Sequence, residues 1–480
     1  MSQKDWPDWV IAQKEKGTEI HALKTGFYKY QITSKWDPEK KRAKKITGKY
    51  LGKLTPEGLI ASKQERVLTE MKAISVKEFG ASKLICTAGS DIIEITKKHY
   101  PGEWKEIISF AIMRLAHATP MKNLGAYYSA SILSEMMPDA KVSPQSASEL
   151  LLNIGRTRNR TVEFMKNFVR GSKQSIIDVT NIFSRSENLI SNTLGHNADG
   201  EYIPQINLAL LYSEDEKHPS FFRMVPGCIR DVSIVPTTLS EAGVKDALLV
   251  GDKGFYSAKN IQYLEENKLL YILPLKRSSS HIDYTPLRNG DKKSFNGFFQ
   301  FEKRMIWHHE MKVESGRRVV LFLDDRLRVQ EERDFLQMVQ GEKRTIQDYH
   351  ERNHLFGTIA ILTNTQLDAR TIYERLKSRL EIEQYFDTFK NLLHADRTYM
   401  SDEYKLEGWM LINFISMLFY YKLYKLLMEK GLLDKYSPAD VILHLSRIQK
   451  LFFNEQWHLS EIPKKTGDIL KKLDLTSIIT

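Results

Sequence analysis

Apolar residues recur with a helical period in the first third of the chain. From about residue 56 to 170, apolar positions return every three or four residues, which predicts a series of amphipathic helices. Pro144 stands near the start of one of them, as is typical of a first helical turn. The clearest predicted helices are residues 103–118, 146–155 and 157–173. Before this region, residues 26–34 and 46–53 are predicted to be short strands that flank a basic turn.

After Gly171 the apolar period changes from helical to alternating. Strands are predicted first in succession and then in alternation with helices, which favours a mixed sheet covered by helices. The predicted strands are residues 175–183, 205–213, 219–227, 247–250 and 269–275, with helices at about 232–243 and 257–267.

Residues 276–364 are more polar but contain further strand-like pieces. A stretch of this length is too long for a structureless loop, so a β-rich insertion is predicted, with strand-like pieces at 298–311, 317–324 and 357–364. An amphipathic helix at 375–391 follows, and then a helical tail. The predicted parts are a basic N-terminal region (1–70), a helical DNA-binding domain (71–170), a core in two pieces (171–275 and 366–400), the insertion (276–365) and a C-terminal helical region (401–480).

The net charge of +11 points to a polyanionic partner, with nucleic acid first and a membrane surface second. Over half of the excess lies in residues 1–70, where Lys41, Arg42, Lys44 and Lys45 are candidate DNA contacts. Aromatic residues nearby could stack on bases, but a solvated basic face explains the same pattern.

Cysteine usage and hydropathy favour a soluble, cytoplasmic protein. Cys86 and Cys228 are far apart and have no metal-like spacing, which fits a reducing compartment. The N-terminal segment lacks a signal-peptide pattern. The longest uncharged stretch, residues 408–421, is too short to span a bilayer, so we expect a buried helix and no membrane partner.

Three charged residues lie on or beside the apolar stripe of the predicted helix at 375–391. At about 100° per residue, Glu383 and Lys390 fall close to Arg379 around the helix axis. A carboxylate removed from water must be paired or bind a metal. An internal Arg379–Glu383 pair at the edge of the stripe is the plain explanation.

Two aspartates in the α/β region offer a second explanation. Asp178 interrupts the apolar strand at 175–183, and Asp252 follows the strand at 247–250 at its carboxyl end, where ligand sites of α/β sheets gather. If these strands are neighbours and the later helix packs across them, Asp178, Asp252 and Glu383 meet. Three such carboxylates select two Mg²⁺ ions, with Mn²⁺ as a possible substitute, for phosphodiester chemistry.

These residues resemble the motifs of the DDE transposases of bacterial insertion sequences. The resemblance covers roughly residues 171–425 and lies in Asp178 with Thr180, Asp252 with Gly254 and Phe255, and Arg379, Glu383 and Lys390. It is closest to the cut-and-paste group with a Y-x2-R-x3-E-x6-K signature and an RNase H-like core. The signature tyrosine falls on Leu376 here, one helical turn after Tyr373, and Lys253 stands where the family often has arginine.

The resemblance implies an α/β, RNase H-like fold and an enzyme that cleaves and joins DNA. It implies metal ligation by Asp178, Asp252 and Glu383. It also implies a homodimer on double-stranded DNA, comprising element ends and target, and release of the second strand through a hairpin. The residues it suggests as DNA contacts are Arg379, Lys390, Lys253, Tyr373 and, as a base-stacking aromatic of the insertion, Trp307, for which packing on its own sheet is the alternative.

Other interpretations stay open at this point. A metal-dependent nuclease would share the three acids without joining ends. A catalytically inactive DNA-binding regulator would use the basic N-terminal region and no metal. The acids could also be buried salt-bridge partners of Arg379 or Lys390. His308 and His309, adjacent on a strand, are predicted to be surface residues, and Asp324–Asp325 a helix cap.

Overall fold

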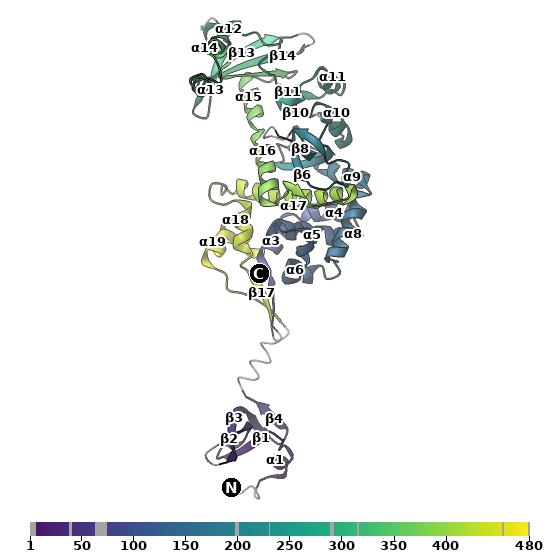
Figure 1. Cartoon of the computed structure of the whole chain (residues 1–480), viewed down its shortest axis with the longest axis vertical. Helices are drawn as coiled ribbons and strands as arrows, with labels where there is room; N and C mark the ends of the chain where they lie inside the picture. Colours follow the sequence, from purple (N-terminus) through teal and green to yellow (C-terminus); the bar gives the residue numbers. More distant parts are fainter. Residues whose placement is uncertain are drawn as a thin grey trace. The chain divides into compact units, whose positions relative to one another are not determined.

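The computed structural model describes residues 6–37, 41–62, 74–196, 201–229, 231–288, 292–313, 316–453 and 456–478 (Figure 1). Contacts within the chain divide it into two compact units. The first comprises Met1–Glu78 and Ile448–Ile462, and the second comprises Phe79–Arg447 and Pro463–Thr480.

The first unit contains a four-stranded antiparallel sheet in the order β1-β2-β3-β4. Its small core is formed by Val10, Ile20 and Leu54, against which two tryptophans and Phe27 pack. The two long strands confirm the prediction of strands on either side of a basic turn. The elements are α1 (Asp8–Ala12), β1 (Thr18–Leu23), β2 (Gly26–Asp37), β3 (Arg42–Thr55) and β4 (Gly58–Ala61).

A second small sheet of this unit joins segments from the two ends of the chain. β5 (Ser75–Glu78) pairs with β17 (Gln449–Phe453), which pairs with β18 (Gln456–Leu459). Two predictions are therefore wrong in part. The stretch predicted to be helical from about residue 56 contains the strands β4 and β5, and its first helix among the described residues begins at Gly80; residues 63–73 lie outside the described ranges. The C-terminal region is not entirely helical, because β17 and β18 lie in it. Pairing across such a separation leaves no local signal in the sequence.

The second unit contains the predicted helices of the first third, which pack around one long buried helix. This is α17 (Glu403–Glu429), which contains the uncharged stretch and contacts α5, α8 and β9 (Figure 1). Pro144 is the first residue of α8, and Ser143 caps it. The helices are α3 (Gly80–Ala88), α4 (Ser90–His99), α5 (Trp104–His117), α6 (Leu124–Ala130), α7 (Leu133–Met136), α8 (Pro144–Gly155), α9 (Arg158–Val169), α18 (Pro438–Leu445) and α19 (Lys464–Lys472).

A large mixed sheet forms the centre of the second unit, which confirms the predicted mixed α/β class. Its order is β12-β13-β14-β15-β11-β10-β6-β8-β7, with β16 paired to β6 and β9 paired to β8. β10 is parallel to both β6 and β11, and the other pairs along this order are antiparallel. The strands and helices of this part are β6 (Gln174–Ser184), β7 (Thr193–His196), β8 (Tyr202–Ser213), β9 (His218–Pro226), α10 (Asp231–Ala242), β10 (Leu248–Val250), α11 (Ala258–Glu266), β11 (Leu270–Pro274) and β16 (Arg397–Thr398).

The predicted insertion is continuous with this sheet. β15 (Thr358–Thr363) lies beside β11 and carries β14, β13 and β12 outward from the core. The single strand-like piece predicted at 298–311 is a hairpin, because Glu302 adopts a positive φ of 52° and reverses the chain. The remaining elements are α12 (Thr285–Arg288), β12 (Gly297–Phe301), β13 (Arg304–Lys312), β14 (Arg318–Asp324), α13 (Asp325–Gln340) and α14 (Ile346–Arg352).

The helix predicted at 375–391 is divided into three segments. α15 (Ala369–Lys377) ends at Ser378, α16 (Leu380–Asp387) begins after Arg379, and η7 (Thr388–Leu392) is a π-helical turn. Ser378 Oγ donates to the Arg375 carbonyl and accepts from the Gln174 side chain, 204 residues away in sequence. This tertiary contact coincides with the break. α15 packs on β11 and α16 on β6.

Candidate active site

Asp178 is a carboxylate in the middle of a buried strand. Ile176 and Ile177 on β6 have no exposed surface, whereas the Asp178 side chain is 17% exposed. Its Oδ1 accepts a hydrogen bond from the Val179 N–H at 2.9 Å. Burial raises the pKa of Asp178 to about 6, because the protein replaces the water that would stabilise the charge; Arg379 opposes this shift, and Asp252 adds to it.

Asp252 reaches the same place from the neighbouring strand. In the parallel pair, Val250 of β10 lies opposite Ile176 of β6, so Asp252 and Asp178 each follow that pair by two residues. A Cβ at Gly251, between Val250 and Asp252, would lie 2.9 Å from the end of the Leu273 side chain, so a larger residue there would require that side chain to shift. The strand ends at Val250, and Asp252 remains 39% exposed.

Arg379 joins the two aspartates. Its Nη1 donates to Asp252 Oδ1 at 3.1 Å, and its Nη2 donates to Asp178 Oδ2 at 3.2 Å. The guanidinium is 16% exposed, and its Nε is buried without a hydrogen-bond partner in the described parts of the chain. One cation thus neutralises two carboxylates that face each other.

Glu383 lies at the margin of this cluster. It is one turn after Arg379 on α16, and its Oε1 is 4.0 Å from the Arg379 Nη2. Its side chain is 53% exposed. Arg379 and Glu383 keep the one-turn spacing expected for a continuous helix despite the break at Ser378, because the Glu383 N–H donates to the Arg379 carbonyl at 3.3 Å.

The donor chemistry suits a divalent cation, although the acids are not gathered as metal ligands. Carboxylate oxygens are the ligands preferred by Mg²⁺ and Mn²⁺, and Asp178 and Asp252 already converge on one positive group. In the described ranges, however, no three His, Cys, Asp or Glu side chains are close enough to hold a metal ion. Arg379 stands between the two aspartates, so a metal there requires its guanidinium to move.

The predicted phosphate contacts differ in their positions. Lys253 follows Asp252 directly and is exposed, and Lys390 is half-buried on η7. Tyr373, by contrast, is fully buried on α15, with its ring 5.1 Å from that of Phe322. The structure therefore does not bring the Tyr373 hydroxyl to the acidic cluster or to solvent.

Trp307 lies on β13 with its ring against its own sheet. Its ring centroid is 4.9 Å from that of Phe298, and the Lys292 ammonium lies 4.8 Å from the ring. This is the packing alternative considered for this tryptophan. Nearby, Asp324 accepts hydrogen bonds from the backbone of Arg326 and Leu327 at the start of α13, which confirms the predicted helix cap.

The predicted basic contacts of the N-terminal region belong to the first unit. Lys41, Arg42 and Lys44 are exposed at the β2–β3 end of the sheet. Lys45 forms an ion pair with Glu19 of β1. The sequence indicates these cations, but not which of them is already paired within the protein.

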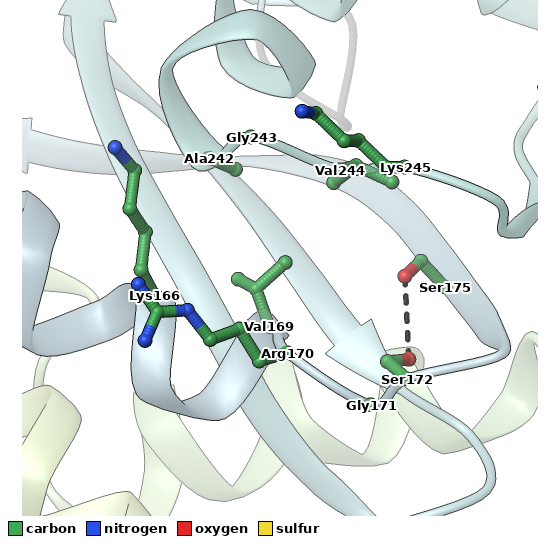
Figure 2. Close-up of a pocket in the computed structure, with 10 residues that line it drawn as sticks. All are labelled: Lys166, Val169, Arg170, Gly171, Ser172, Ser175, Ala242, Gly243, Val244 and Lys245. Atoms are coloured by element: carbon green, nitrogen blue, oxygen red, sulfur yellow. Dashed lines mark hydrogen bonds between the residues drawn. The ribbon is translucent and has the colours of Figure 1, made fainter.

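A separate hollow lies at the amino-terminal end of β6 (Figure 2). Its volume is about 430 Å³, and Lys166, Arg170 and Lys245 surround it. α9 and α10 both end here, so the hollow lies at the negative ends of two helix dipoles; of the three cations, Lys166 belongs to the last turn of α9. The hollow is lined by neither acid of the β6–β10 pair, and we assign no ligand to it.

Fold and site together define an α/β protein whose acidic centre lies where two parallel strands meet a helix. A model of the family described as the transposase DDE domain matches residues 170–419, more than half of the 480 residues. The chain therefore belongs to this family. The match includes Asp178, Asp252 and Glu383.

Among the solved structures that match this chain is one that is distant in sequence. A piggyBac transposase synaptic complex with hairpin DNA, determined by cryo-EM, has 11% sequence identity and a TM-score of 0.37 over 72% of this chain and 70% of that one. No curated protein matches the chain. No helix in the described ranges is long and apolar enough to cross a membrane.

Proposed function

We propose that this protein is the transposase of a bacterial insertion sequence, of the cut-and-paste group with a Y-R-E-K signature and an RNase H-like core. It cleaves the ends of its element and joins them to target DNA. The observation that carries this proposal is the convergence of Asp178 and Asp252 from neighbouring parallel strands onto one cationic group. Membership of the DDE family supports it.

Asp178, Asp252 and Glu383 are the proposed catalytic residues. Their carboxylates would hold two Mg²⁺ ions, and these would supply polarisation of the phosphate oxygens and activation of the attacking hydroxyl. Water attacks the phosphodiester at the element end and releases a 3′-hydroxyl, which then attacks a target phosphodiester; each step breaks one P–O bond and forms one. The second strand leaves through a hairpin, and the protein acts as a homodimer on DNA.

Arg379 has two positions in this proposal. In the structure its guanidinium neutralises the two aspartates. When metal and DNA bind, it turns outward to a backbone phosphate, a ligand that matches its forked donors. Lys253 and Lys390 contribute further positive charge to the same backbone.

One alternative rests on the same observation. If the acids serve only as salt-bridge partners of Arg379, the cluster is structural and the chain is an inactive DNA-binding descendant. In that case metal ions leave the stability of the protein unchanged. A nuclease that hydrolyses without joining shares the acids and differs in its products.

The testing experiment is cleavage of DNA that carries the flanking ends of the protein's own gene, with Mg²⁺ and products mapped to the nucleotide. Cleavage at the element boundary that disappears in Asp178→Asn and Glu383→Gln supports the proposal. The matched control is Asp387→Asn, which removes an exposed carboxylate one turn further along α16 and should retain cleavage. Cleavage that persists in all three variants refutes the assignment of the acids.

A further inference from the structure

The two long strands of the first unit, β2 and β3, extend beyond the shorter strands β1 and β4 that flank them. β1 pairs with residues 26–31 of β2, and β4 pairs with residues 52–55 of β3. Residues 32–36 and 43–47 therefore have no other strand partner among the described residues, although the Ile32 N–H bonds the Gly17 carbonyl at 2.9 Å. We call these two segments, together with Arg42, the β2–β3 ribbon. A two-stranded hairpin of this kind is at best marginally stable in water by itself.

The two faces of the ribbon differ in whether their lysine side chains are paired with a carboxylate. Directly opposite residues of an antiparallel pair share a face, and successive pairs alternate between faces. On one face Ser34 lies opposite Lys45, whose ammonium pairs with Glu19. On the other face Lys35 lies directly opposite Lys44.

This second face carries more cations than carboxylates, with Lys35, Lys44 and Arg42 against Asp37. Like charges directly opposite each other destabilise a strand pair. Arg42 is two residues before Lys44 on the same strand and therefore has its Cβ on the same face. Among the side chains that the structure describes, no carboxylate forms an ion pair with Lys35, Arg42 or Lys44, and these three side chains are exposed. Asp37, whose side chain is outside the described set, lies opposite Arg42 in the strand register. A polyanion that neutralises this face would remove the repulsion.

We propose that the β2–β3 ribbon lies in the major groove of duplex DNA, with Lys35, Arg42 and Lys44 against backbone phosphates. Two strands about 4.8 Å apart, with their side chains, match a groove about 12 Å wide. The major groove of duplex RNA is too deep and narrow to admit the ribbon. The inference rests on the proposed function for the identity of the nucleic acid, and the ribbon is a second DNA contact apart from the acidic cluster.

The first test compares Lys44→Gln with Lys45→Gln in the full-length protein. These neighbouring residues lose the same charge but lie on opposite faces of the ribbon. Binding to a duplex of the element end is measured by fluorescence anisotropy in EDTA at several KCl concentrations. Each lost phosphate contact reduces the slope of log K against log salt by about 0.9.

We expect Lys44→Gln to reduce this slope by about 0.9 and Lys45→Gln to leave it nearly unchanged, because Lys45 is already paired within the protein. The combined variant Lys35→Gln, Arg42→Gln, Lys44→Gln should reduce the slope by about 2.7. Equal effects of Lys44→Gln and Lys45→Gln, or no effect of the combined variant, overturn the inference. Circular dichroism melting verifies that each variant folds.

The second test locates the contact on the DNA. Guanine N7 faces the major groove, so dimethyl sulfate methylation of it should be reduced by the wild-type protein and restored in the combined variant. Protection that the combined variant retains overturns the placement in the groove. An equal loss of slope on single-stranded DNA identifies a general polyanion surface, which also overturns it.

Failure of this inference is distinguishable from failure of the proposed function. Binding is measured in EDTA, so it does not require strand cleavage. A reduced slope for Lys44→Gln without any cleavage by the wild type supports the ribbon and opposes the transposase. Intact cleavage by the wild type, with a salt slope that Lys44→Gln leaves unchanged, supports the transposase and opposes the ribbon.

Discussion

Replacement of Arg379 should increase the affinity of the DNA-free protein for divalent metal. In the structure its guanidinium hydrogen-bonds both Asp178 and Asp252, at 3.2 and 3.1 Å. A metal ion that uses the same oxygens must first displace it. Arg379→Gln removes the competing cation and keeps a side chain of similar reach.

The size of the effect follows from the exposure of each contact. Arg379 and Asp178 are 16% and 17% exposed, and a hydrogen bond between charged groups in such a setting contributes about 1.5–3 kcal/mol. Asp252 is 39% exposed, so solvent screens its contact to about 0.2–1 kcal/mol. The sum of about 2–4 kcal/mol corresponds to a gain in metal affinity of about 30- to 700-fold.

Isothermal titration of Mn²⁺ into full-length protein at pH 7.5, without DNA, measures this change directly. The matched control is Arg375→Gln, which removes an identical charge on α15 where the side chain bonds Gln174 rather than the aspartates. We expect little change in the control. An unchanged Mn²⁺ affinity in Arg379→Gln, or an equal gain in both variants, would falsify the view that Arg379 occupies the position of the metal.

Three further predictions concern buried polar groups. The pKa of Asp178 is raised from 3.8 to about 6, so the stability that its proton confers is present at low pH and is lost as pH rises through these values. In urea unfolding in EDTA, wild type should lose about 2 kcal/mol relative to Asp178→Asn between pH 4 and 6. The opposite trend would contradict the burial of this charge. The Tyr373 hydroxyl is buried without a hydrogen-bond partner within the described ranges, so Tyr373→Phe should raise the free energy of unfolding by about 1 kcal/mol. The same variant should leave binding to element ends unchanged. Weaker binding would instead favour a phosphate contact of Tyr373. Arg158 forms an ion pair with the buried Glu407, so Arg158→Met should lower the free energy of unfolding in urea by about 3–5 kcal/mol at pH 7.5. The loss should be smaller at pH 5, because burial raises the pKa of Glu407 and the carboxyl group becomes neutral more readily. An equal loss at both pH values would show that Glu407 is not the cause.

The meeting of Asp178 and Asp252 was predictable because both lie in an α/β pattern with strong local signals. β10 has only three residues, but all are apolar, and a helix on either side of it indicates a parallel neighbour. The position of Asp252 after this strand then places it at the edge where ligands bind. The helical spacing of Arg379 and Glu383 likewise required no tertiary information.

Other features depend on contacts that leave no local pattern. The break at Ser378 coincides with its hydrogen bond to Gln174, and the bridge from Arg379 to the aspartates depends on a side-chain conformation rather than on periodicity. β5 forms a strand through its pairing with β17. Tyr373 was a reasonable phosphate contact by spacing, yet the insertion covers it with aromatic rings.

Joining of a DNA end to a target is the reaction that distinguishes a transposase from a nuclease and from an inactive DNA-binding protein. A duplex of the element end with a free 3′-hydroxyl is incubated with supercoiled plasmid, the full-length protein and Mg²⁺, and covalently joined products are sequenced. A transposase that uses Asp252 gives joined ends with wild type and none with Asp252→Asn. Plasmid nicking without joining, or equal joining by Asp252→Asn, would contradict this proposal.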